Sequence, residues 1–331
     1  MKVGLIDVDS HNYPNLPLMK IAAYHKAKGD EVEWHWGWGQ YDKVYMSKVF
    51  DDTYSADKPE PINAGNIIKG GTGYFRRNKD GRAEVFVDGK WIDNGTKDSF
   101  RSENVLYTEK LPGEIECCYP DYSLYPNLTK DTAYGFLTRG CPNNCGFCIV
   151  SQKEGRCSCK VADISQWWDG QKNIVLCDPN LLACRDHMDL LRQLEESQAW
   201  VDVNQGFDAR LLTPDNIEAI KRIKIKDIHF AWDQMKNSNR IIRGLNTWKR
   251  YGKKDAHGQW GTVYVLTNFD TTMSENLFRI YKLDKMGFRP YVMVYDKPNA
   301  PREVRLLQRW CNNRAIFKSC PRFEDYDPKR G

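Results

Sequence analysis

The 331-residue sequence has no apolar run that approaches the roughly 18 to 20 residues of a membrane-spanning helix. An export signal is not apparent either, because the charged Lys2 and Asp7 bracket the first apolar run. Neither sign of charge dominates, since 49 Lys and Arg oppose 44 Asp and Glu, for a net charge of +5. We therefore expect a globular protein of the cytoplasm with no membrane partner.

A disulfide framework is also not indicated. The chain has 11 cysteines, an odd number, and three of them lie in one short segment, which favours a reducing compartment. Lys and Arg gather at 221–224, 249–250 and 253–254. We interpret these clusters as solvated helix faces, with a nucleic-acid-binding surface as the alternative.

Three cysteines, Cys141, Cys145 and Cys148, follow a strand-like run over 133–138 and the turn Arg139-Gly140. Their C-x3-C-x2-C spacing can bind three irons of a 4Fe-4S cluster and leave the fourth iron without a protein ligand. An electron-transfer cluster normally has four cysteines, and structural zinc has four ligands, usually in paired C-x2-C units. The spacing therefore favours a cluster with an open iron over a metal knuckle or a reduced-thiol loop.

This motif resembles that of the radical SAM superfamily. In that family the open iron binds S-adenosylmethionine, and an electron from the cluster cleaves its sulfonium to a 5'-deoxyadenosyl radical. The resemblance includes the aromatic Phe147, which in the family lies near the adenine. It implies a 4Fe-4S cluster on Cys141, Cys145 and Cys148, S-adenosylmethionine as cofactor, an electron donor such as flavodoxin or ferredoxin, and a substrate that the motif does not identify.

Residues 1–75 show the pattern of a small doubly wound domain. Strand-like runs at 2–6, 31–36, 43–47 and 66–69 accompany an amphipathic helix over 14–28. The arrangement resembles the cobalamin-binding domain that precedes some radical SAM cores. That resemblance implies His11 beneath cobalt, Ser47 after a later strand, and Gly70 and Gly71 along the nucleotide tail.

Cobalamin is thus a possible cofactor, although Pro14 stands where the family motif has glycine. The alternative is a domain that keeps the shape without the cofactor. Trp34, Trp36 and Trp38 alternate along a strand-like stretch and are expected to pack against a second domain or to stack on a ligand.

Residues 76–130 are predicted to be an insertion and linker. Asp88-Gly89 lies between the β-type runs 83–87 and 90–92, which predicts an exposed hairpin. Prolines punctuate the segment that follows.

Residues 131–331 alternate strand and helix patterns. The expected strands are 133–138, 173–177, 200–204, 227–232, 262–267 and 290–295. The expected helices are 186–198, 214–223 and 273–286. This α/β pattern predicts a partial (β/α)6 TIM-like barrel, with its site at the carboxyl ends of the strands and its open edge closed by the C-terminal tail.

Polar residues follow these strands. Asp178 and Asn180 come after the second strand, and the radical SAM resemblance assigns this segment to the methionine amino group. Asp208 and Arg210 come after the third strand, where a guanidinium can pair bidentately with the methionine carboxylate. Helix caps and a surface cation are the alternatives for these residues.

Two further features leave alternatives open. Asp233 ends the fourth strand and is a candidate for a ribose hydroxyl or for the substrate. The cysteines outside the motif, such as Cys157 and Cys159, could serve an auxiliary cluster or donate a hydrogen atom, or could be free thiols.

The resulting functional hypothesis is a radical SAM enzyme that abstracts hydrogen and then transfers a methyl or other group to an unknown substrate. One alternative is a radical SAM enzyme that modifies nucleic acid. The other is a non-catalytic iron-sulfur or zinc module.

Overall fold

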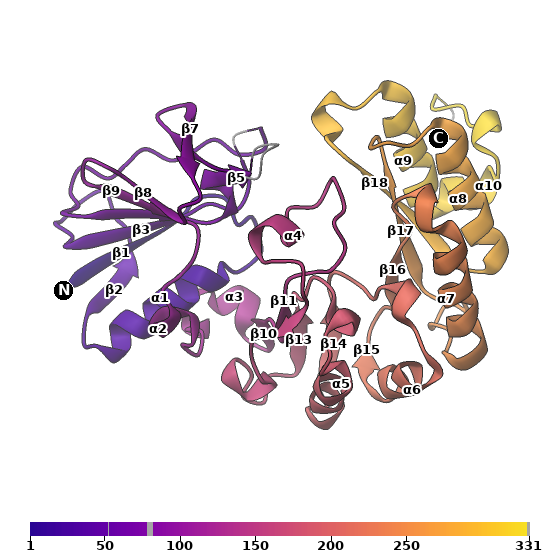
Figure 1. Cartoon of the computed structure of the whole chain (residues 1–331), viewed down its shortest axis with the longest axis horizontal. Helices are drawn as coiled ribbons and strands as arrows, with labels where there is room; N and C mark the ends of the chain where they lie inside the picture. The colour runs from indigo at the N-terminus through magenta and orange to yellow at the C-terminus, as the bar shows by residue number, and fades with distance from the viewer. Residues whose placement is uncertain (52, 78–81, 330–331) are drawn as a thin grey trace. The chain divides into compact units, whose positions relative to one another are not determined.

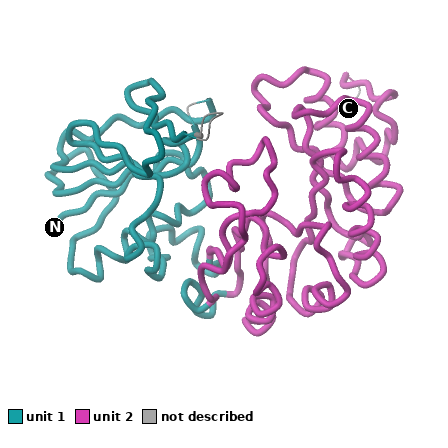
Figure 2. Tube along the Cα trace, in the orientation of Figure 1, with its two compact units in different colours: residues 1–133, 165–171 teal, residues 134–164, 172–331 magenta. Residues whose placement is uncertain are grey.

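The computed structural model describes residues 1–51, 53–77 and 82–329. The fold is α/β with parallel sheets, as predicted. The chain divides into two compact units, which are 1–133 with 165–171 and 134–164 with 172–331 (Figure 2). Over the described ranges, no helix is both long and apolar enough to cross a membrane.

The first unit is built on a six-stranded sheet of order β2-β1-β3-β4-β9-β8. Its strands are β1 (Lys2–Asp7), β2 (Glu31–Trp34), β3 (Lys43–Ser47), β4 (Ile67–Gly70), β8 (Ser99–Ser102) and β9 (Val105–Thr108). All neighbouring pairs from β2 to β9 are parallel, and β8 is antiparallel to β9. Counted among the parallel strands, this is the 2-1-3-4-5 order of one common doubly wound sheet.

Helices cover one face of this sheet. The helix α1 (Leu16–Ala27) begins where the Asn15 side chain accepts a hydrogen bond from the Leu18 amide, and it packs together with α2 (Gly113–Glu116). The core on this face consists of Val3, Leu5, Leu18, Ile21, Ala22, Tyr45 and Ile115. The short helix α3 (Pro126–Thr129) follows α2 in the same unit.

A small antiparallel sheet covers the other face. It consists of β5 (Phe75–Arg77), β6 (Ala83–Val87) and β7 (Lys90–Gly95). The predicted Asp88-Gly89 turn is present, with φ of 48° and 78°. The hairpin is not an exposed appendage as predicted, because Ala83, Val85 and Val87 alternate into the core. The large sheet also continues past residue 75, since β9 pairs with β4.

The second unit has two parallel sheets. One has the order β10-β13-β14-β15, from β10 (Thr132–Gly135), β13 (Asn173–Leu176), β14 (Trp200–Val203) and β15 (Lys224–Ile225). The other has the order β16-β17-β18, from β16 (His229–Ala231), β17 (Thr262–Thr267) and β18 (Arg289–Val294). A parallel bridge joins Phe207 to Phe230 between them. Within the described residues these sheets do not form a continuous barrel.

Helices lie between these strands along the chain or follow the last of them. They are α5 (His187–Glu196), α6 (Pro214–Arg222), α7 (Ser238–Tyr251), α8 (Met273–Met286), α9 (Arg302–Asn312) and α10 (Arg314–Ser319). Capping boxes begin α6 at Thr213 and α8 at Thr272, and Gly287 ends α8 with φ of 83°. In Figure 1, α7, α8 and α9 lie along one side of β16, β17 and β18.

The helix α9, which follows β18 in the chain, covers this edge strand. The Asn312 side chain accepts from the Val292 amide at 2.7 Å and donates to the Val292 carbonyl at 3.0 Å. Gln308 donates to the same carbonyl at 3.2 Å. These bonds pair backbone groups that an edge strand would otherwise leave open.

Candidate metal and cofactor site

The three motif cysteines lie on a loop with a closed base. The loop runs between β11 (Thr138–Arg139) and β12 (Cys159–Lys160), which are antiparallel, and it contains α4 (Val150–Lys153). The Cys141 amide donates to the Gly155 carbonyl at 3.1 Å. Gly140 has φ of 83°, and a Cβ there would lie 2.1 Å from the Cys157 carbonyl oxygen. A side chain at position 140 would therefore open the base of the loop.

A carboxylate braces the start of the loop. Glu154 accepts from the Arg139 guanidinium at 2.7 Å and from the Gly140 amide at 3.0 Å. One side chain thus ties the segment before the cysteines to the segment after them.

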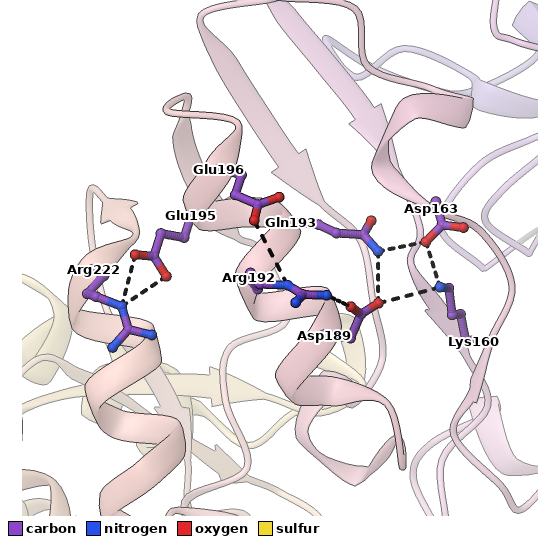
Figure 3. Close-up of polar contacts among 8 residues, drawn as sticks. All are labelled: Lys160, Asp163, Asp189, Arg192, Gln193, Glu195, Glu196 and Arg222. Atoms are coloured by element: carbon purple, nitrogen blue, oxygen red, sulfur yellow. Dashed lines mark hydrogen bonds and ion pairs between the residues drawn. The ribbon is translucent and has the colours of Figure 1, made fainter.

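The segment that leaves the loop is anchored to α5 (Figure 3). Lys160 pairs with Asp163 at 2.6 Å, and Gln193 donates to Asp163 at 2.6 Å and to Asp189 at 3.1 Å. Hydrogen bonds from Lys160 and Gln193 lower the pKa of Asp163. The same figure shows α5 joined to α6 through Arg222 and Glu195, 2.9 Å apart.

Cys141, Cys145 and Cys148 are all half-buried, and the Cys148 amide donates to the Cys145 carbonyl at 3.0 Å. Burial raises the pKa of the Cys145 and Cys148 thiols, and neighbouring Asp233 adds to both shifts. In the part of the chain that the structure describes, no three Cys, His, Asp or Glu side chains form a ready-made metal site. As a donor set, three sulfurs suit an iron-sulfur cluster with one iron left open.

Two of the predicted cofactor residues meet beside Cys141. The Asn180 side-chain nitrogen lies 3.7 Å from the Cys141 sulfur and 3.1 Å from the Asp208 carboxylate. Asn143, from the cysteine loop, donates to the same carboxylate oxygen at 3.1 Å. The Asn180 side-chain oxygen is buried and has no hydrogen-bond partner among the residues that the structure describes. A buried acceptor of this kind normally has a partner, so a ligand donor would satisfy it.

Arg210 completes this group. Its Nε and Nη2 atoms donate to the two oxygens of Asp208 at 2.7 and 2.6 Å, and the pair is mostly buried. The hydrogen bond from Arg210 helps to lower the pKa of Asp208 against the effect of burial, which raises it. Behind them α7 packs closely, since a Cβ on Gly244 would lie 1.7 Å from the Ala209 carbonyl oxygen.

The Asp178 side chain does not join the polar group of Asn180, Asp208 and Arg210. Its carboxylate accepts from the Leu137 amide at 2.8 Å, from the Thr138 amide at 2.7 Å and from the Thr138 hydroxyl at 2.5 Å. Burial raises its pKa to about 6, although these bonds oppose the shift. They also explain why the predicted strand 133–138 breaks into β10 and β11. Asp178 therefore holds the backbone that leads into the cysteine loop.

Asp233 lies near a buried cation that the sequence did not reveal. Burial raises the pKa of Asp233 to about 6, and Arg279 and then Arg210 oppose the rise. Arg279 is 0% exposed and donates to the Trp232, Asp233 and Leu266 carbonyls at 2.6, 2.8 and 2.8 Å. In the sequence, Arg279 could be recognised only as a charged residue on the apolar face of α8, beside Ile280 and Leu283.

Aromatic rings gather beside the cysteine loop. Phe147 meets Phe269 edge-on with ring centroids 5.5 Å apart, and Phe269 meets Tyr295 at 4.9 Å. Phe269 and Tyr295 lie just beyond β17 and β18, at the carboxyl ends. Phe147 was predicted from the sequence, but its two neighbours were not. In the sequence they are marked only as aromatic residues close behind predicted strands.

A second set of polar rings lies on the strands themselves. His229, Tyr264 and Tyr291 stand side by side on β16, β17 and β18, with centroids 5.3 and 5.8 Å apart. The Nδ1 atom of His229 is buried and has no hydrogen-bond partner within the described ranges, and burial lowers the pKa of this imidazole while Asp202 opposes the shift. These residues also escaped the sequence analysis. Their signal is polar side chains at alternate positions of otherwise apolar strands.

The residues assigned to cobalamin have other partners. Ser47 exchanges hydrogen bonds with Asn15, the cap of α1, at 2.9 and 3.1 Å. Gly71 has φ of 106°, and a Cβ there would lie 2.2 Å from the Lys48 carbonyl oxygen. His11 is exposed on the loop after β1, and Gly70 packs against the Thr108 carbonyl. The chain itself thus occupies the space beside Ser47 and Gly71, so these two residues do not fit a cobalamin tail, whereas His11 is exposed.

The chain matches none of the protein-family models with which it was compared, and no curated protein sequence matches it. The chemistry of the site is therefore inferred from its own residues.

Proposed function

We propose that the chain is a radical SAM enzyme whose Cys141, Cys145 and Cys148 hold a 4Fe-4S cluster. The observation that carries the proposal is the unpaired, buried oxygen of Asn180 in the group that contacts the Cys141 sulfur. When bound, the cluster and S-adenosylmethionine would supply the electron transfer and the reactive carbon. The protein would position the ligands and exclude water.

The polar group beside the cysteines suits the methionine end of S-adenosylmethionine. The Asn180 oxygen can accept from an ammonium group. Two of the five N–H donors of Arg210 bond to the side chain of Asp208, and the others can pair with a ligand carboxylate. Asp208 holds the guanidinium in place. In this proposal Asp178 acts indirectly, by fixing the start of the loop.

The aromatic group suits the adenosine end. Phe147, Phe269 and Tyr295 offer ring faces and edges to a flat base. Asp233 lies close enough to Cys145 to affect its pKa, and its carboxylate can accept from ribose hydroxyls.

The strand order supports a partial barrel as the scaffold. The strands β10, β13, β14, β16, β17 and β18 occur in this order along the chain, with the short β15 beside β14, and a parallel bridge joins Phe207 to Phe230. In the proposal the two sheets form the walls of an open (β/α)6 barrel, with the cysteine loop at its carboxyl end. His229 and Tyr264 would then face the substrate, whose radical would go on to methyl or other group transfer.

The proposal is tested by anaerobic reconstitution with iron and sulfide. We expect about four irons and about four sulfides per chain, as for a single cubane cluster. Reduction in the presence of S-adenosylmethionine should then yield 5'-deoxyadenosine. A flavodoxin or ferredoxin should serve as electron donor in place of a chemical reductant.

The matched variants are Cys145→Ser and Cys117→Ser. Cys145→Ser should lose both the iron and the product, whereas Cys117→Ser, at an exposed cysteine outside the loop, should keep them. One zinc per chain with no sulfide would instead support a non-catalytic metal module. Wild-type protein with an intact cluster that never cleaves S-adenosylmethionine would contradict the proposed activity.

A further inference from the structure

The first unit has a topological switch point that the chain itself closes. In this sheet β2 lies on one side of β1, and β3, β4 and β9 lie on the other, so the strand order reverses at β1. Ligands of such sheets bind at the carboxyl ends of the strands, near the point of reversal. Here the buried Asp9 carboxylate accepts from the Val49 and Phe50 amides, both at 2.8 Å. The loops after β1 and β3 are thereby clamped together.

An open cavity lies on the other side of β1. It has a volume of about 540 Å³ and is lined by Leu5, Ile6, Asp7, Trp34, His35, Lys58, Pro59 and Tyr125. Asp7 and Trp34 are the last residues of β1 and β2, so the cavity opens at the carboxyl ends of two adjacent parallel strands. Its volume falls within the range of about 300 to 1,000 Å³ that is common for small-molecule sites.

Two aromatic rings form one corner of the cavity. The centroids of Trp34 and Tyr125 are 5.3 Å apart, and the ring planes meet at 78°. The Tyr125 hydroxyl donates to the Asp7 carboxylate at 2.6 Å, which fixes the ring. A flat ligand can stack on the face of one ring while it meets the edge of the other. Trp36 and Trp38, by contrast, are 63% and 89% exposed and do not line the cavity.

Charges of both signs lie beside this corner. Lys58 is exposed at the rim, and its ammonium group donates to the Asp7 backbone carbonyl. An ammonium group has three donors, so two remain for an anion. The Asp7 carboxylate accepts one bond at each oxygen, from Ser10 and Tyr125, and each oxygen can accept another. Carboxylates at strand ends bind ribose hydroxyls in other nucleotide-binding sheets.

We propose that this cavity binds a nucleoside monophosphate. The base stacks in the corner of Trp34 and Tyr125, the ribose hydroxyls donate to Asp7, and Lys58 meets the phosphate. This site lies wholly in the first unit and uses none of the residues that the proposed radical SAM function requires. Its occupancy therefore does not depend on a cluster or on cleavage of S-adenosylmethionine.

The test is isothermal titration calorimetry of the full chain with AMP, GMP, CMP and UMP. We expect at least one of them to bind at one site per chain, more tightly than ribose 5-phosphate or inorganic phosphate. Lys58→Ala should weaken that nucleotide about tenfold, as loss of a charge-assisted contact does. The same variant should leave the corresponding nucleoside nearly unaffected. Trp34→Leu should weaken both nucleotide and nucleoside, and thermal melting would show that it still folds.

Control variants separate this site from others. Lys110→Ala changes an exposed lysine of the same unit that does not line the cavity, and it should bind like wild type. Cys145→Ser should also keep the affinity, since loss there would place the nucleotide at the proposed S-adenosylmethionine site and overturn the inference. Absence of binding by all nucleotides, equal binding of phosphate alone, or wild-type affinity in both Lys58→Ala and Trp34→Leu would overturn it as well.

Discussion

Arg279 is a buried cation whose acceptors are mostly backbone carbonyls at the ends of two strands. Its guanidinium reaches the carbonyls of Trp232 and Asp233 beyond β16 and that of Leu266 in β17. Burial lowers its pKa to about 10, so it remains charged at neutral pH. This residue therefore links α8 to the segment that carries Asp233.

Replacement of Arg279 by methionine should destabilise the protein. The substitution keeps an unbranched side chain but leaves several buried carbonyl oxygens without a donor, at a cost of about 3 kcal/mol or more in the free energy of unfolding. Urea unfolding followed by circular dichroism measures this. Arg243→Met, at an exposed arginine of α7, should change the same quantity by less than about 0.5 kcal/mol. Equal stability of the two variants would show that the carbonyls do not need Arg279.

Asp178 should make the stability depend on pH. Its pKa rises from 3.8 to about 6 on folding, so the folded protein binds the proton more tightly than the unfolded chain. This stabilisation is complete below pH 3.8 and is lost as the pH rises to about 6, with a change of about 3 kcal/mol.

The variant Asp178→Asn should lose the part of the decline that Asp178 contributes, while the part from Asp233, whose pKa also rises to about 6, remains. Urea unfolding across the same pH window measures the free energy of unfolding of both proteins. The value for the variant minus that for wild type should rise by about 3 kcal/mol as the pH rises. Asp215→Asn, at an exposed carboxylate of α6, serves as the control and should follow wild type. A decline in Asp178→Asn as steep as that of wild type would assign the titration to another group.

Single residues could be proposed as candidates from the sequence where a local pattern marks them. The three cysteines, Phe147, Asp208 and Arg210 stand out because they follow strand-like runs or have a characteristic spacing. Arg279 and His229 did not stand out in the sequence, since the groups that they contact lie far away along the chain. A buried charge on an apolar helix face is visible in the sequence, but the carbonyls that satisfy it are not.

At the scale of elements, the cysteine loop depends on how its two ends meet. The ladder of β11 and β12 closes the base, and Gly140 lies against the Cys157 carbonyl. The sequence did not predict β12, and it predicted β11 only as the end of a longer strand, because two-residue strands have no detectable period. By contrast β3, β17 and α8 have the predicted bounds, since alternation and a capping box define them locally.

The substitution Gly140→Ala should open the loop and lower the iron content after reconstitution. Gly155→Ala is a matched control, since Gly155 also has positive φ, 97°, but a Cβ there has no neighbour within 4 Å. Both variants acquire backbone strain of about 1 to 2 kcal/mol, and only Gly140→Ala adds the clash. Iron and sulfide analysis distinguishes them. Equal iron in the two variants would mean that closure of the base is not required for the cluster.

At the scale of the whole molecule, strand order was harder to predict than strand position. The strands of the first unit were predicted as far as residue 75, but β9 returns to the sheet from beyond the hairpin. Pairing across such an insertion has no local signal. The hairpin covers the second face of the sheet because Ala83, Val85 and Val87 occupy the alternate, buried positions of β6. This alternation was visible in the sequence, but the segment was predicted to be an exposed insertion.

The first unit should not retain cobalamin. The Ser47 hydroxyl bonds to Asn15, and Gly71 lies against Lys48, so the chain itself occupies two of the positions assigned to the cobalamin tail. Anaerobic purification with added hydroxocobalamin should leave no corrin absorbance after gel filtration, in wild type and in His11→Ala alike. Stoichiometric corrin in wild type and its loss in His11→Ala would contradict this reading of the fold.

The central claim is that the three-cysteine loop leaves one iron open to S-adenosylmethionine. The most direct test is electron-nuclear double resonance on the reduced, reconstituted protein with S-adenosylmethionine labelled with ¹⁵N at its amino group. We predict a nitrogen coupling that shows the amino group bound to iron. A reduced cluster that gives no such coupling, with the ligand present at saturating concentration, would contradict the account.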